Sequence, residues 1–180
     1  MEDTVVSEEK TVLDTKMLRT CMGLFATGVT VVTYTAEGSA AGMTANAFMS
    51  VSLNPPLVLV SVRASSRFNK WVRHGVRYGI NLLAESQRPL SMHFGGSPGE
   101  GLELPFNGDQ GTPLLDGSLD QIVARTVDVH PAGDHHLYIG EVEYVRFGEH
   151  ERPLVFYGGK YRQILTHMPL LSANGSLEGW

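Results

Sequence analysis

The stretch from Gly42 to Leu53 decides the fold, and it reads GMTANAFMSVSL. Small and hydroxyl-bearing residues dominate it, whereas the interior of a strand usually favours bulky side chains. Small side chains let a planar ligand approach the backbone, whose N–H groups can then bond ring carbonyls and nitrogens. An edge strand with its hydroxyls facing water explains the pattern equally well. In the ligand-binding interpretation, the polar anchors are Thr44, Asn46, Ser50 and Ser52.

Strands are expected on both sides of this stretch. Residues 29–35 are β-branched and aromatic, Glu37-Gly38 forms a turn, and residues 40–53 continue as extended chain, which predicts a hairpin. Asn54-Pro55-Pro56 then breaks the chain. Residues 57–62 are mostly apolar, as in a strand that is covered on both faces.

Helices are expected at three places outside these strands. Asp14 or Thr15 can cap the first helix, and Gly28 supplies its stop signal. Ser65 can cap a second, short helix, and residues 87–94 predict a third. In the first helix, apolar residues recur at helical spacing at Leu18, Cys21, Met22 and Phe25.

The rest of the chain is rich in strand patterns. They cover residues 78–83, 119–129, 137–147, 154–157 and 161–165. Strands dominate and helices are peripheral, which favours a β-barrel with helical additions over a parallel α/β sheet. The sequence therefore predicts a mainly β fold.

The length of 180 residues suits one domain. The first residues are acidic and aperiodic and the last are rich in Ser, Gly and Asn, which predicts an N-terminal tail (1–15), one domain (16–166) and a C-terminal tail (167–180). Glycines and prolines between Gly95 and Pro113 predict a long loop. Loops of that length within a compact domain are usually functional or mobile.

Composition narrows the range of functions. Cys21 is the single cysteine, which excludes an intramolecular disulfide and a CxxC motif and suits a reducing cytoplasm, where we expect the protein. The net charge of -5 gives no electrostatic footprint for nucleic acid. No apolar run approaches the roughly 20 residues of a transmembrane helix, and the acidic start does not resemble a secretory signal. We expect neither a nucleic acid nor a membrane as partner.

Residues 63–70, RASSRFNK, form a second candidate site. Two hydroxyls, on Ser65 and Ser66, stand at the start of a predicted helix. Arg67 and two further cations lie close by in the sequence. Helix N-terminal amides combined with an arginine suit a phosphate group. A capped helix with solvated surface charges is the more common outcome for such a cluster.

Residues 133–142, GDHHLYIGEV, form a third candidate site, in which a tight turn opens a strand. His135 and His136 point to opposite faces of that strand, so they do not share one metal ion. A site that combines His135 with Glu141 lacks a second histidine on the same face, and we predict no metal site. Two interpretations remain, a solvent-exposed histidine pair at a turn or one imidazole that lines a cofactor pocket.

Several familiar motifs are missing from the sequence. It contains no GxGxxG after a strand, no GxxxxGK[ST] loop, no GxSxG elbow and no HExxH. These absences argue against a Rossmann dehydrogenase, a P-loop NTPase, an α/β-hydrolase and a zincin. No residue stands out as a nucleophile activated by a neighbouring base.

Taken in order, these segments resemble the flavin reductase-like family, which has an FMN-binding split-barrel fold. The resemblance covers about residues 16 to 166. It rests on residues 25–33 (FATGVTVVT), 42–62, the Gly133-Asp134-His135 turn with Gly140-Glu141-Val142, and 153–162 (PLVFYGGKYR). Gly158 stands where many relatives have a basic residue, and the loop 95–113 matches nothing in the pattern.

The resemblance implies an NADH- or NADPH-dependent reductase of FMN or FAD that supplies reduced flavin to a partner monooxygenase, often as a homodimer. By that likeness, His135 helps to place the nicotinamide. Ser65, Ser66 and Arg67 lie near the flavin phosphate. The flavin ring and ribityl chain are held by Thr44, Asn46, Ala47, Ser50 and Ser52.

Two other functions fit the same resemblance. One is an oxidoreductase that keeps its flavin tightly bound and reduces another small acceptor. The other is a non-catalytic flavin- or haem-binding module on the same barrel, because one fold hosts many functions. The sequence leaves FMN against FAD and NADH against NADPH open.

Overall fold

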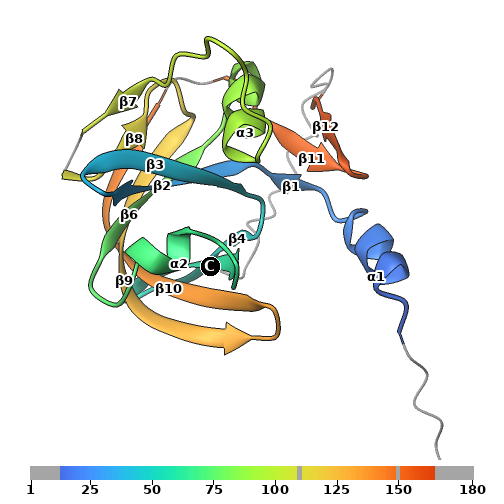
Figure 1. Ribbon diagram of the computed structural model, residues 1–180, viewed down its shortest axis with the longest axis horizontal. Helices are drawn as coiled ribbons and strands as arrows, with labels where there is room; N and C mark the ends of the chain where they lie inside the picture. Colours follow the sequence, from blue (N-terminus) through green and yellow to red (C-terminus); the bar gives the residue numbers. More distant parts are fainter. Residues whose placement is uncertain (1–12, 109–110, 149–150, 165–180) are drawn as a thin grey trace, which may run out of the picture.

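The computed structural model describes residues 13–108, 111–148 and 151–164. Its main feature is a curved antiparallel sheet with the strand order β3-β2-β6-β9-β10-β5-β4 (Figure 1). These strands are β2 (Thr30–Ala36), β3 (Ser39–Ala45), β4 (Phe48–Leu53), β5 (Pro56–Arg63), β6 (Arg77–Leu82), β9 (Asp120–Ala132) and β10 (His135–Phe147). The predicted mainly β fold is confirmed.

The two edge strands of this sheet, β3 and β4, follow each other directly in the sequence. Asn46 and Ala47 alone link them, so the sheet curls until its edges approach each other, as in a barrel. β3 and β4 do not pair, which leaves the barrel split. We call this junction the seam. The Ser61 N–H of β5 donates to the Ala47 carbonyl at 2.9 Å and holds the seam against the neighbouring strand.

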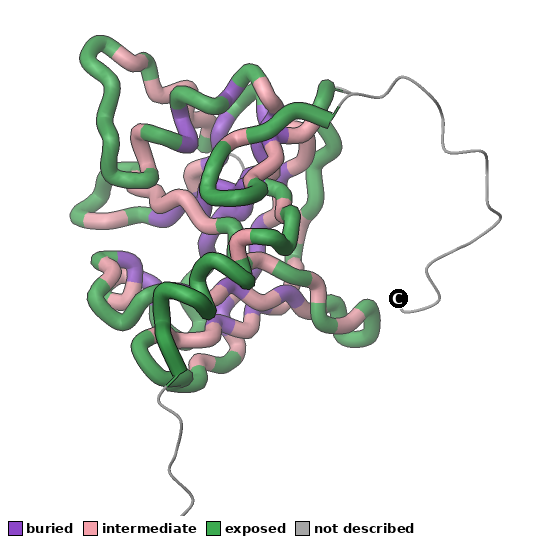
Figure 2. Tube along the Cα trace, turned by 90° about the vertical axis from the view of Figure 1, so that its right-hand side faces the viewer, coloured by how far each residue is buried: buried purple, intermediate pink, exposed green. Residues whose placement is uncertain are grey.

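The main core fills the inside of the barrel, and the buried segments lie toward the centre of Figure 2. Phe68 is fully buried there, and its ring meets those of Tyr34, Tyr78 and Tyr138 edge to face, with centroids 5.1, 5.9 and 5.0 Å apart. Aromatic pairs of this geometry stabilise a core beyond their buried area. The Tyr138 hydroxyl also donates to Asn69 Oδ1 at 2.9 Å.

The helices and short strands lie around this sheet. α1 (Thr15–Met22) projects from the body, whereas α2 (Phe68–Trp71), the 3-10 turn η1 (Glu85–Gln87) and α3 (Arg88–Phe94) pack on it (Figure 1). The short strands are β1 (Thr27–Gly28), β7 (Phe106–Asn107), β8 (Leu114–Leu115), β11 (Val155–Tyr157) and β12 (Lys160–Arg162). No helix in the described part of the chain is long and apolar enough to cross a membrane.

The first helix is shorter than its sequence pattern predicts. Asp14 caps it as expected, through a 2.8 Å bond from the Lys16 N–H to the Asp14 side chain. The helix ends at Met22 with Gly23 as its C-cap, rather than near Gly28, which is already paired in β1. The predicted tails lie outside the described residues, apart from residues 13–15 at the start of α1.

Two strand predictions also need correction. The extended chain of residues 40–53 is not continuous, since it divides into β3 and β4 at the seam. The strand at residues 57–62 is not covered equally on both faces. Val58, Val60 and Val62 are buried in the core, and the residues between them are half-buried, as expected for an antiparallel sheet with one core face.

Candidate active site

A cleft of about 560 Å³ opens at the seam. Five parts of the fold meet there, namely the end of β3 with the seam itself, the end of β5, the turn before α2, the end of α3 and the start of β10. The lining residues are Met43, Thr44, Ala45, Asn46, Ala47, Ser61, Val62, Arg63, Ser66, Phe94, Gly95 and His135.

The cleft contains the first half of the stretch that decides the fold. Thr44, Asn46 and Ala47 line it, as the sequence predicts. The Thr44 hydroxyl donates to the Ser91 carbonyl at 2.7 Å, so it ties β3 to α3 at the cleft wall. Ser50 and Ser52 lie further along β4 and are not among the lining residues.

The cationic side of the cleft also differs from the prediction. Arg63 and Ser66 line the cleft, whereas Ser65 and Arg67 do not. Arg67 hydrogen-bonds to the buried Tyr34, where burial raises the pKa of the Tyr34 hydroxyl and the nearby guanidinium opposes that rise. Among the residues described, the cleft lining includes no Asp or Glu. Its charge therefore favours an anionic ligand group.

The helix cap expected at Ser65 does not form, because the N-cap residue of α2 is Arg67, which makes no side-chain capping bond. A turn closes when the Ser66 N–H donates to the Arg63 carbonyl at 2.9 Å, and Ser66 Oγ then accepts the Phe68 N–H at 3.3 Å. Since α2 begins at Phe68 and its N-cap is Arg67, Ser65 stands two residues before the capping position. The sequence signal for a turn was correct, but the predicted cap was wrong.

His135 reaches the cleft from the start of β10. Its Nδ1 lies 2.7 Å from Asp134 Oδ1, and this hydrogen bond lowers the pKa of the Asp134 carboxyl. His136 points to the other face, and its buried Nδ1 has no hydrogen-bond partner among the residues described. The two imidazoles are thus divided between the faces of the strand, as the sequence predicts. No group of three His, Cys, Asp or Glu side chains suited to a metal ion occurs in the described part of the chain.

The sequence did not predict that α3 forms one wall of the cleft. Phe94 and Gly95 line the cleft at the end of this helix. A Cβ on Gly42 would lie 3.0 and 3.1 Å from two atoms of the Phe94 ring, so any side chain there would press against that ring. The glycine was visible in the sequence, but its partner lies 52 residues away and only the tertiary structure brings them together.

Arg63 belongs to the second candidate site, residues 63–70, in which Arg67 was singled out from the sequence instead. It is the direct cross-strand partner of His135 in the pairing of β5 with β10. Once these two strands are aligned from their turn and apolar residues, the arginine and the histidine fall at the same end of the sheet. A planar ligand at the seam would have backbone and small side chains on one side and Arg63, Ser66 and His135 at its polar end.

Known proteins resemble this chain over most of its length. The sequence profile of the flavin reductase like domain matches residues 22–165. An NADH-dependent flavin reductase from Rhodococcus sp is 45% identical over 150 residues, which cover 82% of this chain and 85% of that protein. The reductase component of 4-hydroxyphenylacetate 3-monooxygenase from Thermus thermophilus is 38% identical over 141 residues, 78% of this chain and 91% of that one.

The solved structures agree with the sequence matches. The flavin reductase PheA2 superposes with a TM-score of 0.78 at 41% identity, covering 85% of this chain and 99% of the other. A split barrel with a ligand cleft at its seam defines a class of flavin-binding proteins. Within that class, this chain belongs to the flavin reductase-like family.

Proposed function

We propose that this protein is an NADH-dependent flavin reductase that supplies reduced flavin to a separate monooxygenase. The observation that carries the proposal is the seam cleft, which combines small residues on β3 with Arg63, Ser66 and His135 in a chain of this family. Relatives carry the names NADH-dependent flavin reductase and monooxygenase reductase component. FMN and FAD both remain candidate flavins.

Each side of the cleft has a distinct task. Main-chain groups from Ala45 to Ala47 face the flavin ring, because the small side chains there let the ring approach the backbone. Arg63 and Ser66 hold the flavin phosphate, and Asn46 adds a polar contact. His135 places the nicotinamide. Ser65 and Arg67 lie outside the cleft lining. Ser65 is part of the turn that the Ser66 N–H closes onto the Arg63 carbonyl, and Arg67 contacts Tyr34.

The protein contributes position and electrostatics to the reaction. With both substrates bound, the nicotinamide supplies a hydride and the flavin ring accepts it. Holding the two rings in reactive alignment lowers the entropic barrier, a task that requires no nucleophile. N–H groups of the seam are placed to stabilise negative charge that develops on the ring. This assignment explains why the sequence lacks an activated Ser, Cys or Lys.

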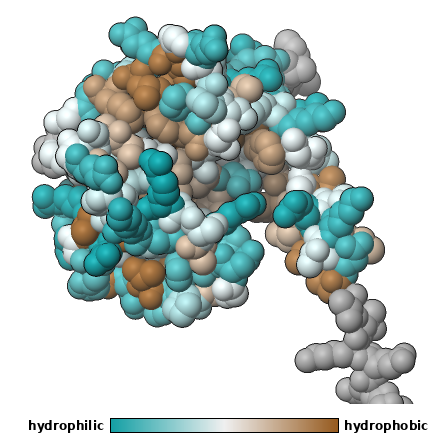
Figure 3. All heavy atoms as spheres, viewed as in Figure 1, coloured by the Kyte–Doolittle hydropathy of each residue, from teal (hydrophilic) through white to brown (hydrophobic). Residues whose placement is uncertain are grey.

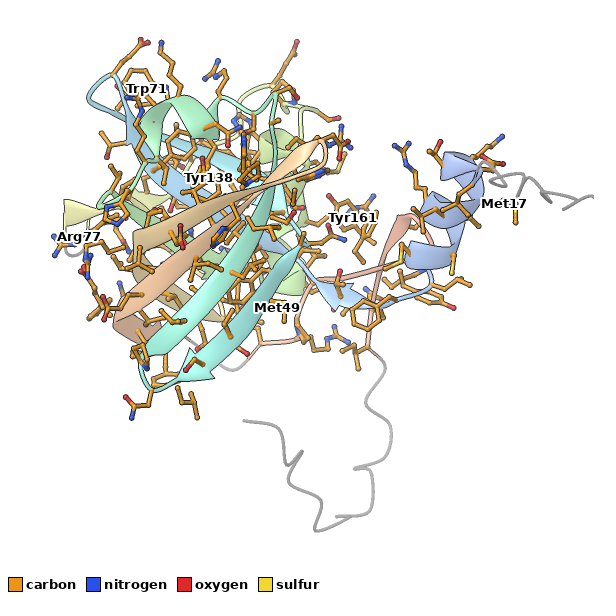
Figure 4. All side chains as sticks on the ribbon, turned by 90° about the horizontal axis from the view of Figure 1, so that it is seen from below. Met17, Met49, Trp71, Arg77, Tyr138 and Tyr161 are labelled. Carbon is orange, nitrogen blue, oxygen red and sulfur yellow. The ribbon has the colours of Figure 1, made fainter. Side chains whose placement is uncertain are left out.

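We also propose that the protein is a homodimer. α1 has no buried residue, and Met17 on α1 and Met49 on β4 are 69% and 57% exposed (Figure 4). The projecting helix carries apolar side chains, brown in Figure 3. An apolar hollow of about 270 Å³ lies between the chain after α1 and the start of β4, lined among others by Phe25 and Phe48. Exposed apolar area of this kind on an edge strand indicates a protein interface.

An anaerobic assay tests the function directly. The protein is mixed with NADH or NADPH and excess FMN, FAD or riboflavin, and the absorbance of nicotinamide and flavin is followed. Multiple turnovers of free flavin with NADH are expected. Reduction limited to one bound flavin per chain would favour an oxidoreductase with a resident flavin, and no reduction would favour a binding module.

Transfer to a partner requires that flavin leave the protein. The cleft is open to solvent at Asn46 and Ala47, which are both exposed, so we expect modest affinity and rapid exchange. We place the reaction in the cytoplasm, where NADH is available. Cell fractionation checks that location, and rapid dilution of reduced protein into an oxygenase assay checks the release.

A further inference from the structure

The chain around α2 is strongly cationic, although the protein as a whole is acidic. The net charge is -5, yet no Asp or Glu occurs between Glu37 and Glu85. Within this interval, residues 63–77 contain five of the 14 Lys and Arg residues of the chain. They are Arg63, Arg67, Lys70, Arg73 and Arg77. Positive charge is therefore concentrated in one short part of the molecule.

Carboxylates lie beside the two ends of this segment. Arg77 forms an ion pair with Glu143, and Asp134 lies near Arg63. Lys70 and Arg73 are exposed and make no ion pair with any residue that the structure describes. Lys70 Nζ lies 4.7 Å from the centroid of the Trp71 ring, a contact that leaves its charge in place. We call Lys70 and Arg73 the α2 cations.

The α2 cations are close to the seam cleft because α2 is anchored to the turn that lines it. Asn69 Nδ2 donates to three carbonyls of the turn at residues 63–66, at 2.8, 3.0 and 3.0 Å. One helical turn, about 6 Å, separates Lys70 from Ser66 in the cleft lining. Arg73 is at most about 11 Å further along the chain. Their field reaches the cleft, since the Debye length is roughly 10 Å at 0.1 M salt and 30 Å at 0.01 M.

The α2 cations are also separate from the proposed dimer interface. In Figure 4, Trp71 on α2 lies on the opposite side of the barrel from Met17 and away from Met49. The apolar hollow between the chain after α1 and the start of β4 includes no residue of α2. The dimer proposed above would therefore leave these charges open to solvent, where they can act on approaching ligands.

We propose that the α2 cations, Lys70 and Arg73, form an electrostatic funnel that draws the phosphate-bearing substrates, flavin nucleotide and NADH, to the seam cleft. The inference rests on the proposed function. Both substrates are anions at their phosphates, and a net charge of -5 would otherwise repel them. A positive field beside a cleft raises the concentration of an anion at its mouth without a contact in the bound complex. The α2 cations therefore act on substrate capture and not on hydride transfer.

The Arg73→Glu variant tests the proposal, with Arg146→Glu as its matched control. Both arginines are exposed, and both substitutions change the net charge equally. Arg146 lies roughly 30 Å along β10 from His135 in the cleft. At about 50 mM ionic strength, we expect Arg73→Glu to lower kcat/KM for FMN and for NADH about threefold, and Lys70→Glu in addition to lower it about tenfold. Arg146→Glu should leave both values within about 1.5-fold.

Salt and a neutral flavin separate a funnel from a binding contact. The loss in Arg73→Glu should shrink to less than about 1.5-fold at about 0.5 M ionic strength, because salt screens exposed charges. Riboflavin carries no phosphate, so its kcat/KM at saturating NADH should be the same in wild type and variants. The kcat at saturating FMN should also be unchanged.

Several results would overturn the funnel. They are an equal loss with riboflavin, a loss that persists at high salt, or the same loss in Arg146→Glu. A loss confined to NADPH would also overturn it, since it would indicate a direct contact with the 2′-phosphate. Failure of the proposed function is distinct, because wild-type protein would then oxidise no NADH with any flavin. FMN binding followed by flavin fluorescence would still report the effect of charge and salt.

Discussion

The two halves of the stretch from Gly42 to Leu53 look alike in sequence and do different things in the structure. Residues 42–47 run along β3 to the seam and line the cleft. Residues 48–53 form β4, where Met49, Val51 and Leu53 are exposed and point away from the core. One half therefore lines the cleft, and the other faces outward with apolar side chains.

The difference shows that small polar residues mark a ligand site only where a second element faces them. β3 meets the ends of β5, β10 and α3 across the cleft, whereas the outer edge of β4 has no neighbouring strand within the described residues. An unpaired edge strand with exposed apolar side chains promotes aggregation unless another chain covers it. Substitutions in the two halves should therefore affect flavin binding and dimerisation separately.

The largest effect is expected from charges on the second half. Met49→Glu together with Val51→Glu would place two carboxylates in the proposed dimer interface and weaken dimerisation by at least about a hundredfold. Analytical ultracentrifugation measures this change. Ser39→Glu on the opposite edge strand is the control and leaves the dimer intact. A double variant that still dimerises would show that β4 lies outside the interface.

Filling the first half is expected to block the cleft. Ala47→Trp puts an indole at the seam and raises the KM for flavin at least about tenfold, because the ring occupies ligand space. Steady-state kinetics measure it, with circular dichroism to verify folding and Thr35→Trp as a surface control away from the cleft. The oligomeric state should not change. A normal KM would place the flavin elsewhere.

Arg63 and Arg67, the two arginines that precede α2, test which residue binds the flavin phosphate. Arg63→Ala should raise the KM for FMN about tenfold and leave riboflavin nearly unaffected, since riboflavin lacks the phosphate that the guanidinium binds. Arg67→Ala should change the KM for FMN less than about twofold, because Arg67 lies beside Tyr34 and outside the cleft. Equal effects of the two changes would contradict the assignment of Arg63.

The smallest effects concern the serines of β4. Ser50→Ala and Ser52→Ala should each alter the KM for flavin by less than about twofold, since neither residue lines the cleft. The Ser52 hydroxyl instead accepts the Asn54 N–H at 3.2 Å. If either change raised this KM as much as Arg63→Ala does, the ligand would extend along β4, as the sequence alone suggests.

Much of this fold could be predicted from sequence because its signals are local. β-branched runs, the Glu37-Gly38 turn and the Gly133 turn place β2, β5, β6, β10 and β11 within two residues of their bounds, whereas the two-residue strands β1, β7 and β8 were not expected. The seam could not be predicted, because no local signal at residues 46–47 ends the strand. The break arises where the two edges of the folded sheet approach each other. The same holds for Phe94, whose place in the cleft depends on packing against Gly42.

The candidate site also combines features that local sequence signals predict with features that depend on tertiary structure. Thr44, Asn46, Ala47, Ser66 and His135 all line one cleft, and motif order was enough to group them. The sequence did not show which serine and which arginine of residues 63–67 line the cleft. Ser65 and Ser66, like Arg63 and Arg67, carry the same functional groups, and only the fold of the turn decides which side chains face the cleft. Strand alternation separates His135 from His136, because adjacent residues face opposite sides, and the Gly133-Asp134-His135 motif decided between them.

The two-residue link at the seam has a consequence for how this protein can vary. Asn46 and Ala47 connect strands at opposite edges of one sheet, so an insertion or deletion there would shift the register of β3 against β2 or of β4 against β5. Substitutions leave both registers in place. Variation at the seam should therefore be limited in chain length far more than in residue type, and a library of single insertions across residues 40–53 would show its sharpest loss of activity at these two positions.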